Sequence, residues 1–431
     1  MQAQALLQIL RDNSCRLMHL DDHIFLMLGT EEQAREAPKP TFNNAVFISI
    51  DLENGVPFVG AAEVGSPPSL SDIYRFSKVY YRKTIAIGCK QGNAESTDLF
   101  FCCPLRQQAI ANAVVLIGGL LVLVRGHTSD SVASVFRPIS PLFEQYDEGI
   151  CVQDCWRALC HVRELGWLNF PEDLRNDLLD ETSDHGSDAT GAQEPIDSIR
   201  DQEQNHASSH LADGPAIDAA AKAAEPPYID MEEYLHYADP NGRLHILAPG
   251  SLLVLPPPAV DLPAGTTWAD LRDGRRFAPA FLAPLAADLG ADLLVRAGPP
   301  GAYDPAAFLA AGVAIEDLAA GGGGGAGEAG AIAGMLRRMD RFLHLARVSP
   351  GAVAVHGALP GGGGGGGGGQ GACGLCVLLS AALIRLHAFP AAAAVAWTVM
   401  AAPQSAAPAD AAAAAAGAAG LPSSGGWVQG P

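Results

Sequence analysis

The chain has 431 residues and a formal net charge of −20, from 47 acidic and 27 basic side chains. That length is sufficient for two domains with cores of ordinary size. The acidic balance excludes general binding to nucleic acid or to anionic lipid, because both are negatively charged themselves. It favours a basic peptide or protein as partner, although acidity also serves solubility alone.

Hydrophobic periodicity predicts alternating strands and helices over residues 1–170, and therefore an α/β domain. The expected strands are residues 21–28, 47–51 and 84–89. The expected helices are residues 70–82, 110–124, 129–136 and 152–165. The longest apolar run, residues 109–124, is shorter than the ~20 residues that a membrane helix needs. We therefore expect a buried helix there and no membrane span.

Residues 171–227 break this pattern, since they are rich in acidic and small residues and nearly free of aromatic ones. We predict a disordered acidic linker or insertion. Residues 405–431 are dominated by Ala, Pro and Gly and are expected to be a disordered tail.

Order is expected again over residues 228–404, as a second α/β domain. Its predicted strands are residues 244–247, 252–255, 293–296 and 353–356, the first two joined by a Pro-Gly turn. Its predicted helices are residues 277–289, 305–312, 330–346 and 377–387.

The nine cysteines lack the spacing of a disulfide framework, and the first residues lack the basic and apolar regions of a signal peptide. These features predict a reducing, intracellular compartment. Cys373 and Cys376 form a CxxC pair, but His356 and His387 are not at the spacing of a zinc finger. We expect neither a metal nor a cofactor.

Residues 352–372 run from an apolar strand through nine consecutive glycines into a helix. Strand, Gly-rich loop and helix is the layout of a phosphate cradle, because loop N–H groups and a helix N-terminus favour an anion. The loop lacks a nucleophile at Gly357 and an arginine before Arg385. A run of glycines must also lose much conformational entropy to hold one shape.

The order of motifs along the chain resembles the cell-division-cycle-fourteen (mitotic exit) dual-specificity protein phosphatases. In the first half the similar segments are FISID at 47–51, EVGSP at 63–67, ANAVVLIG at 111–118 and GWLNF at 166–170. In the second half they are EYLHY at 233–237, VR at 295–296, YD at 303–304, DL at 317–318, AVH at 354–356 and AW at 396–397. The resemblance implies two tandem phosphatase-like domains, of which only the second is catalytic.

The family's catalytic loop reads His-Cys-x5-Arg, with a thiolate nucleophile, an arginine that clamps the phosphoryl group and an aspartic acid on a nearby loop. Here His356 matches the family's histidine, and Gly357 stands at the cysteine position. The acid loop that should follow Leu318 is replaced by alanine and glycine. We therefore assign no catalytic residue. His356 is either part of a degenerate phosphate loop or a strand-end histidine bonded to backbone, and we favour the structural role.

Two further segments could carry chemistry. Cys151 and Arg157 fit C-x5-R, but no glycine lies between them and a helix is predicted to start there, so we interpret the match as chance. The acidic residues Asp230, Glu232 and Glu233 resemble part of the family's substrate groove, which implies recognition of a basic residue after a phosphoserine-Pro. A solvated helix start explains the same acids equally well.

The leading interpretation is a catalytically dead pseudophosphatase that binds phosphoproteins or basic Ser-Pro peptides. The alternative is an active cysteine-dependent phosphatase whose catalytic loop lies in an exon missing from this sequence. A third possibility is a structural adaptor that uses the acidic segment 171–227. The resemblance implies the cytoplasm, the nucleus, or the centrosome or cilium as location.

Overall fold

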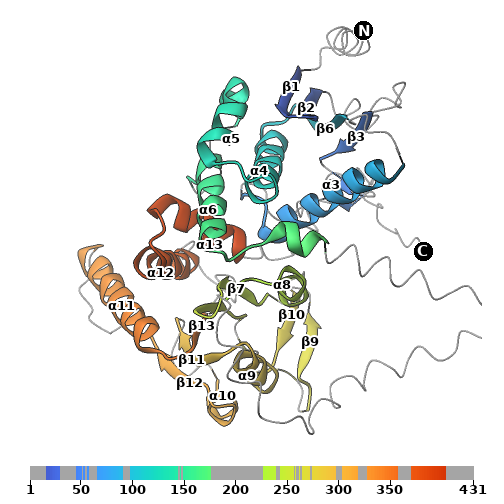
Figure 1. Ribbon diagram of the computed structural model, residues 1–431. Helices are drawn as coiled ribbons and strands as arrows, with labels where there is room; N and C mark the ends of the chain where they lie inside the picture. The colour runs from blue at the N-terminus through green and yellow to red at the C-terminus, as the bar shows by residue number, and fades with distance from the viewer. Residues whose placement is uncertain are drawn as a thin grey trace, which may run out of the picture.

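The structure is a computed structural model that describes residues 16–29, 45–50, 52–53, 56–57, 66–90, 98–143, 146, 149–175, 227–238, 243–256, 258, 262, 265–271, 274–297, 303–318, 328–357 and 370–403. It is an α/β protein with two mixed sheets, each packed against helices (Figure 1). The prediction of disorder over 171–227 falls almost wholly outside the described residues, and that over 405–431 falls entirely outside them.

The first sheet has four strands in the order β1-β2-β6-β3. Strand β2 pairs antiparallel with β1 and parallel with β6, and β3 pairs parallel with β6. The strands are β1 (Arg16–Asp21), β2 (Ile24–Gly29), β3 (Ala45–Ser49) and β6 (Asp98–Pro104), and the short pair β4 (Leu52–Glu53) and β5 (Val56–Pro57) stands apart. The strands predicted over 21–28 and 47–51 are thus confirmed, with shifted ends.

The helices of this first part are α3 (Leu70–Lys90), α4 (Gln107–Leu123), α5 (Ser129–Phe136), the 3-10 turn η1 (Arg137–Leu142) and α6 (Val152–Glu164). The prediction of a buried helix over 110–124 is confirmed, because nearly every residue of α4 from Ala109 onward is buried. No helix in the described part of the chain is both long and apolar enough to cross a membrane.

The strand predicted over residues 84–89 is wrong, because α3 continues through them to Lys90. A Ser69–Asp72 capping box starts this helix: the Ser69 N–H and hydroxyl both donate to Asp72 Oδ2, at 2.9 and 2.7 Å, and the Asp72 N–H donates to Ser69 Oγ. At Thr84 the hydroxyl bonds the Tyr80 carbonyl one turn earlier, which lets a β-branched residue remain helical. The prediction missed β1, β4 and β5, and it also missed β6, whose apolar run lies buried between β2 and β3.

The second sheet has five strands in the order β12-β11-β13-β8-β7, all parallel except the edge strand β7. Its strands are β7 (His245–Ala248), β8 (Leu252–Val254), β11 (Ala291–Arg296), β12 (Ala314–Asp317) and β13 (Ala352–His356), and β9 (Trp268–Leu271) with β10 (Gly274–Phe277) forms a separate hairpin. Its helices are α8 (Met231–Ala238), α9 (Pro279–Asp288), α10 (Ala306–Ala310), α11 (Glu328–Val348), α12 (Gln370–His387) and α13 (Ala391–Ala401). Every strand and helix predicted in this half is present, whereas the strands β9, β10 and β12 and the helices α8 and α13 were not among those predicted.

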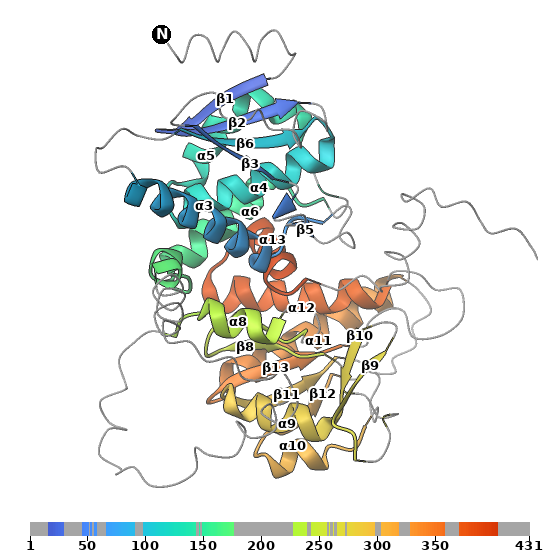
Figure 2. The same cartoon turned by 90° about the vertical axis from the view of Figure 1, so that its right-hand side faces the viewer.

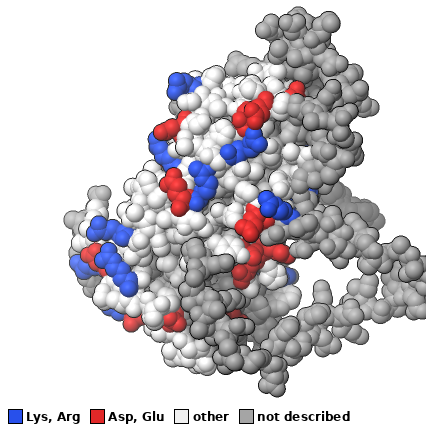
Figure 3. Space-filling view, in the orientation of Figure 1, with Lys and Arg blue, Asp and Glu red and all other residues white. Residues whose placement is uncertain are grey.

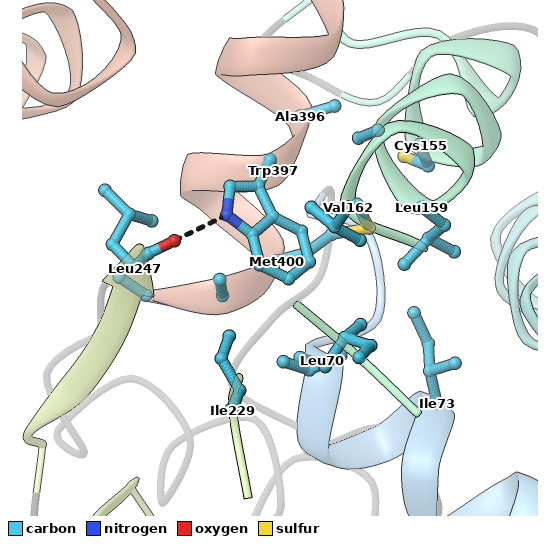
Figure 4. Packing of buried hydrophobic residues seen from close by; sticks show 14 of the residues in the cluster. Leu70, Ile73, Cys155, Leu159, Val162, Ile229, Leu247, Ala396, Trp397 and Met400 are labelled. Carbon is cyan, nitrogen blue, oxygen red and sulfur yellow. Dashed lines mark hydrogen bonds between the residues drawn. The ribbon is translucent and has the colours of Figure 1, made fainter. Parts of the chain in front are cut away.

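The last helix, α13, joins the two parts. It packs against α6 of the first part and against α12 of the second, and Figure 2 shows it between them. Trp397 is fully buried here, and its indole Nε1 donates to the Leu247 carbonyl at 2.9 Å (Figure 4). Around it lie side chains from both parts, among them Leu70, Leu159 and Ile229. The buried core therefore continues from one sheet to the other through this helix.

Candidate functional site

The second sheet brings the ends of three parallel strands together. In the register of the sheet, Arg296 at the end of β11 pairs with Asp317 of β12 on one side and with His356 of β13 on the other. The crevice outside the carboxyl ends of parallel strands is where open α/β sheets bind ligands. The candidate phosphate loop would leave β13 at this edge, so we take these strand ends as the candidate site.

Arg296 is bound on three of its nitrogens. Nε and Nη2 donate to the two carboxylate oxygens of Asp317, at 2.6 and 2.7 Å, and Nη1 donates to the Tyr303 carbonyl at 3.1 Å. The side chain is buried, and the hydrogen bonds that it donates to Asp317 raise its pKa further above the usual range. A bidentate pair of this kind is strong and directional. Arg296 therefore holds β12 and the Tyr303 segment against β11.

His356 is buried, with 5% of its surface exposed, and its Nε2 lies 2.6 Å from the Tyr303 hydroxyl. Burial, with a smaller contribution from the nearby Arg296 charge, lowers the imidazole pKa to about 4, and Asp317 opposes the shift. Burial also raises the pKa of Tyr303, so that both groups are neutral at pH 7. The expected structural role of His356 thus has a geometric basis, but its partner is a side-chain hydroxyl and not backbone.

Gly357 follows His356 at the end of β13. A Cβ added at this position would lie 3.5 Å from Leu375 Cδ2, an ordinary van der Waals contact. The backbone and its neighbours therefore do not require glycine at this position. The glycine run at 361–369 and the glycines at 321–325 lie outside the described residues.

The three acidic candidates lie on α8. The Asp230 carboxylate accepts the N–H groups of Glu232 and Glu233, at 2.9 and 3.0 Å, so it caps the first turn of this helix. The side chains of Glu232 and Glu233 are exposed. Helix α8 packs against β7, which β8 separates from β13. The structure thus groups the three acids together, on a different edge of the sheet from His356.

The C-x5-R match in the first part is not a cradle. Cys151 precedes α6, and Arg157 lies within that helix and pairs with Asp154 one turn earlier, at 3.1 Å. The neighbouring thiols of Cys155 and Cys160 have pKa values raised by burial, so neither is an activated nucleophile. Over the residues that the structure describes, no three His, Cys, Asp or Glu side chains are arranged to hold a metal ion.

Sequence reasoning missed the cluster of Arg296, Asp317 and Tyr303. All three fall in segments of the resemblance, but nothing in their spacing shows that they meet at His356. The strand β12, residues 314–317, was not predicted, and Asp317 comes beside Arg296 only through the parallel pairing of β12 with β11. No protein-family model matches this sequence, and no curated protein matches it either.

Proposed function

We propose that this chain is a divergent member of the mitotic-exit dual-specificity phosphatase family, with two tandem phosphatase-like domains, that binds phosphoproteins without hydrolysing them. One observation carries the proposal. Strand β13 ends at His356, and Gly357 follows it at the carboxyl edge of the parallel strands, where a cysteine-dependent phosphatase needs its thiolate.

The side chains of Arg296 and Asp317 at this edge are hydrogen-bonded to each other. Asp317 uses both carboxylate oxygens on Arg296, and Arg296 uses three nitrogens on Asp317 and Tyr303. An arginine engaged in this way does not clamp a phosphoryl group, and a carboxylate paired in this way does not supply a proton. Among the residues that the structure describes, this edge keeps a strand scaffold and presents no thiol, which supports a binding protein derived from a phosphatase.

For binding, the exposed carboxylates of Glu232 and Glu233 are the groups that would meet a basic peptide. Asp230 serves this surface indirectly, since it fixes the helix start that presents them. These carboxylates account for a basic residue in the partner, and the family resemblance supplies the rest of its chemistry, a phosphoprotein segment in which that basic residue follows phosphoserine-Pro.

The test combines turnover and binding. The full chain is assayed with p-nitrophenyl phosphate and with a phosphoserine-Pro-Lys peptide, and we expect no vanadate-sensitive turnover of either. We expect the labelled peptide to bind, and the double variant Glu232→Gln/Glu233→Gln to bind it about 3- to 10-fold more weakly, since each exposed ion pair contributes up to ~1 kcal/mol. Glu164→Gln, an exposed acid at the end of α6, is the matched control. Vanadate-sensitive turnover would overturn the proposal.

The ordinary contact that a Cβ at Gly357 would make favours one alternative, an active phosphatase encoded with the loop intact. Sequencing the transcript across codons 318–376 decides between the two. A transcript that encodes His-Cys-x5-Arg and an Asp-Gly acid loop would support the active phosphatase. A transcript that matches the present sequence would support the binding protein.

A further inference from the structure

A pocket of about 400 Å³ lies in the first part of the molecule, between α5, η1 and α6. Figure 1 shows α5 and α6 next to each other. The volume is that of a small-molecule site, whereas packing voids in a folded protein are seldom larger than a water molecule. No lining residue belongs to α8 or to the ends of β11, β12 and β13, so this α5–α6 pocket is separate from the candidate site.

The floor of the α5–α6 pocket is aromatic. Phe136, Phe143 and Trp156 line it, and all three side chains are buried. The Phe136 ring stacks on the Trp156 indole, with centroids 5.5 Å apart, and Phe143 meets Phe136 edge-on at 6.5 Å. Aromatic rings favour a further ring in offset-stacked or edge-on contact. The floor is therefore suited to a flat, apolar ligand.

An arginine lies at the mouth of this pocket. Arg137 lines the pocket and is exposed, and its Nη2 donates to Ser134 Oγ at 3.4 Å. Within the described residues, no carboxylate forms an ion pair with its guanidinium. Figure 3 shows that many charged side chains on the face drawn lie beside a charge of the opposite sign. In a chain of formal net charge −20, an arginine without such a partner favours an anionic ligand.

The start of α6 also lines the pocket, through residues 151–153. The first N–H groups of a helix lack intrahelical partners and favour negative charge. The side chain of the N-cap residue, Cys151, makes no capping hydrogen bond to them. The acid of this turn, Asp154, is buried, pairs with Arg157 at 3.1 Å and does not line the pocket. The helix start and Arg137 therefore attract an anion to the same pocket.

We propose that the α5–α6 pocket binds a small aromatic carboxylate. The ring of this ligand would lie against Phe136, Phe143 and Trp156. Its carboxylate would accept hydrogen bonds from the Arg137 guanidinium and from the N–H groups at the start of α6. An extended peptide is not favoured, because peptide recognition uses a long groove or a sheet edge, and this pocket is neither.

The experiment compares three probes that share one ring system and differ in charge: 2-naphthoate, 2-naphthylmethanol and 2-naphthylmethylammonium. The cation is included because Glu144, Asp147 and Glu148 lie between η1 and α6 in the sequence, outside the described residues. Each probe is titrated with the full chain by saturation-transfer NMR. We expect 2-naphthoate to bind with a dissociation constant below about 1 mM. The alcohol should bind about 10-fold more weakly, because it lacks the charge-assisted hydrogen bond, and the cation more weakly still.

Two variants locate the binding. Arg137→Gln should weaken the binding of 2-naphthoate about 10-fold and that of the alcohol less than about 2-fold, because only the carboxylate uses the charge. The matched control is Arg337→Gln, which makes the same change of charge at an exposed arginine of α11 and should change either affinity less than about 2-fold. Ala133→Phe places a ring in the pocket wall and should weaken both probes at least ~10-fold by filling the space.

Circular dichroism melting of each variant reports whether it is folded. The proposal is overturned if 2-naphthoate does not bind, or if the alcohol or the cation binds as tightly as the carboxylate. Equal effects of Arg137→Gln and Arg337→Gln would overturn it as well, since the carboxylate would then not meet Arg137. A folded Ala133→Phe variant that binds 2-naphthoate with unchanged affinity would show that the ligand lies elsewhere. If Ala133→Phe does not fold, the comparison of the two arginine variants decides.

Discussion

His356 and His245 are buried imidazoles on the second sheet, and burial lowers the pKa of each to about 4 from an ordinary value of 6.5. Both have an Nδ1 atom that is buried without a hydrogen-bond partner. A proton placed on either ring would be a charge in a low-dielectric interior. The unfolded chain accepts that proton readily, so these two residues make folding sensitive to acid.

We therefore predict that the free energy of unfolding is unaffected by these histidines above pH 6.5 and falls as the pH drops from 6.5 towards 4. In this window the unfolded state binds the proton that the folded state excludes, so each group contributes a slope of about 1.4 kcal/mol per pH unit. Urea unfolding at intervals of pH measures it. His356→Gln keeps an acceptor for the Tyr303 hydroxyl and should reduce the slope by about 1.4 kcal/mol per pH unit, the contribution of one histidine. The exposed-site variant His236→Gln should leave the slope unchanged, and an equal loss in both variants would contradict the assignment.

At the scale of elements, α4 and α6 are held at close distance by a glycine. A Cβ at Gly118 of α4 would overlap the indole of Trp156 on α6. That indole is buried, stacks on Phe136 and donates to the Val114 carbonyl at 3.3 Å. Glycine weakens an isolated helix. Its presence in the middle of α4 is therefore explained by the close packing of Trp156 from α6.

We predict that Gly118→Ala destabilises the protein by about 2 kcal/mol, because the added methyl group displaces Trp156 or separates the two helices. Gly334→Ala is the matched control, since a Cβ there meets nothing within 4 Å and Gly334 also lies inside a helix, α11. It should stabilise by about 0.5–1 kcal/mol through helix propensity alone. Urea denaturation of both variants measures the difference, and the same sign for both would refute the packing argument.

At the scale of the whole molecule, α13 couples the two parts. Trp397 is fully buried, bonds to β7, and lies among residues of α3 and α6 (Figure 4). Nearby, the Tyr234 hydroxyl of α8 donates to the Ala401 carbonyl at 2.7 Å. A helix at the end of the described chain thus stabilises elements near its beginning.

We predict that Trp397→Ala lowers the free energy of unfolding by about 3–5 kcal/mol. Because its contacts span both parts, the variant should also separate one cooperative transition into two, seen by comparing circular dichroism with tryptophan fluorescence in urea. The control is Trp268→Ala, since Trp268 is 44% exposed and stacks on Arg275 at 4.2 Å. The free energy of unfolding of that variant should fall by no more than about 1 kcal/mol. A single transition in Trp397→Ala would show that α13 does not couple the parts.

Local pattern alone determined much of this protein. The apolar run of α4, the stripe of α11 and the β-branched segment of β13 each carry their own periodicity, and each was predicted within a few residues. The sequence alone also determined that residues 356 and 357 carry no thiol, because they are His356 and Gly357 in any fold. Only the tertiary structure placed β6 at the centre of the first sheet and brought Arg296, Asp317 and Tyr303 to His356. Strand order and register depend on pairings between residues far apart in the chain, which no local period encodes.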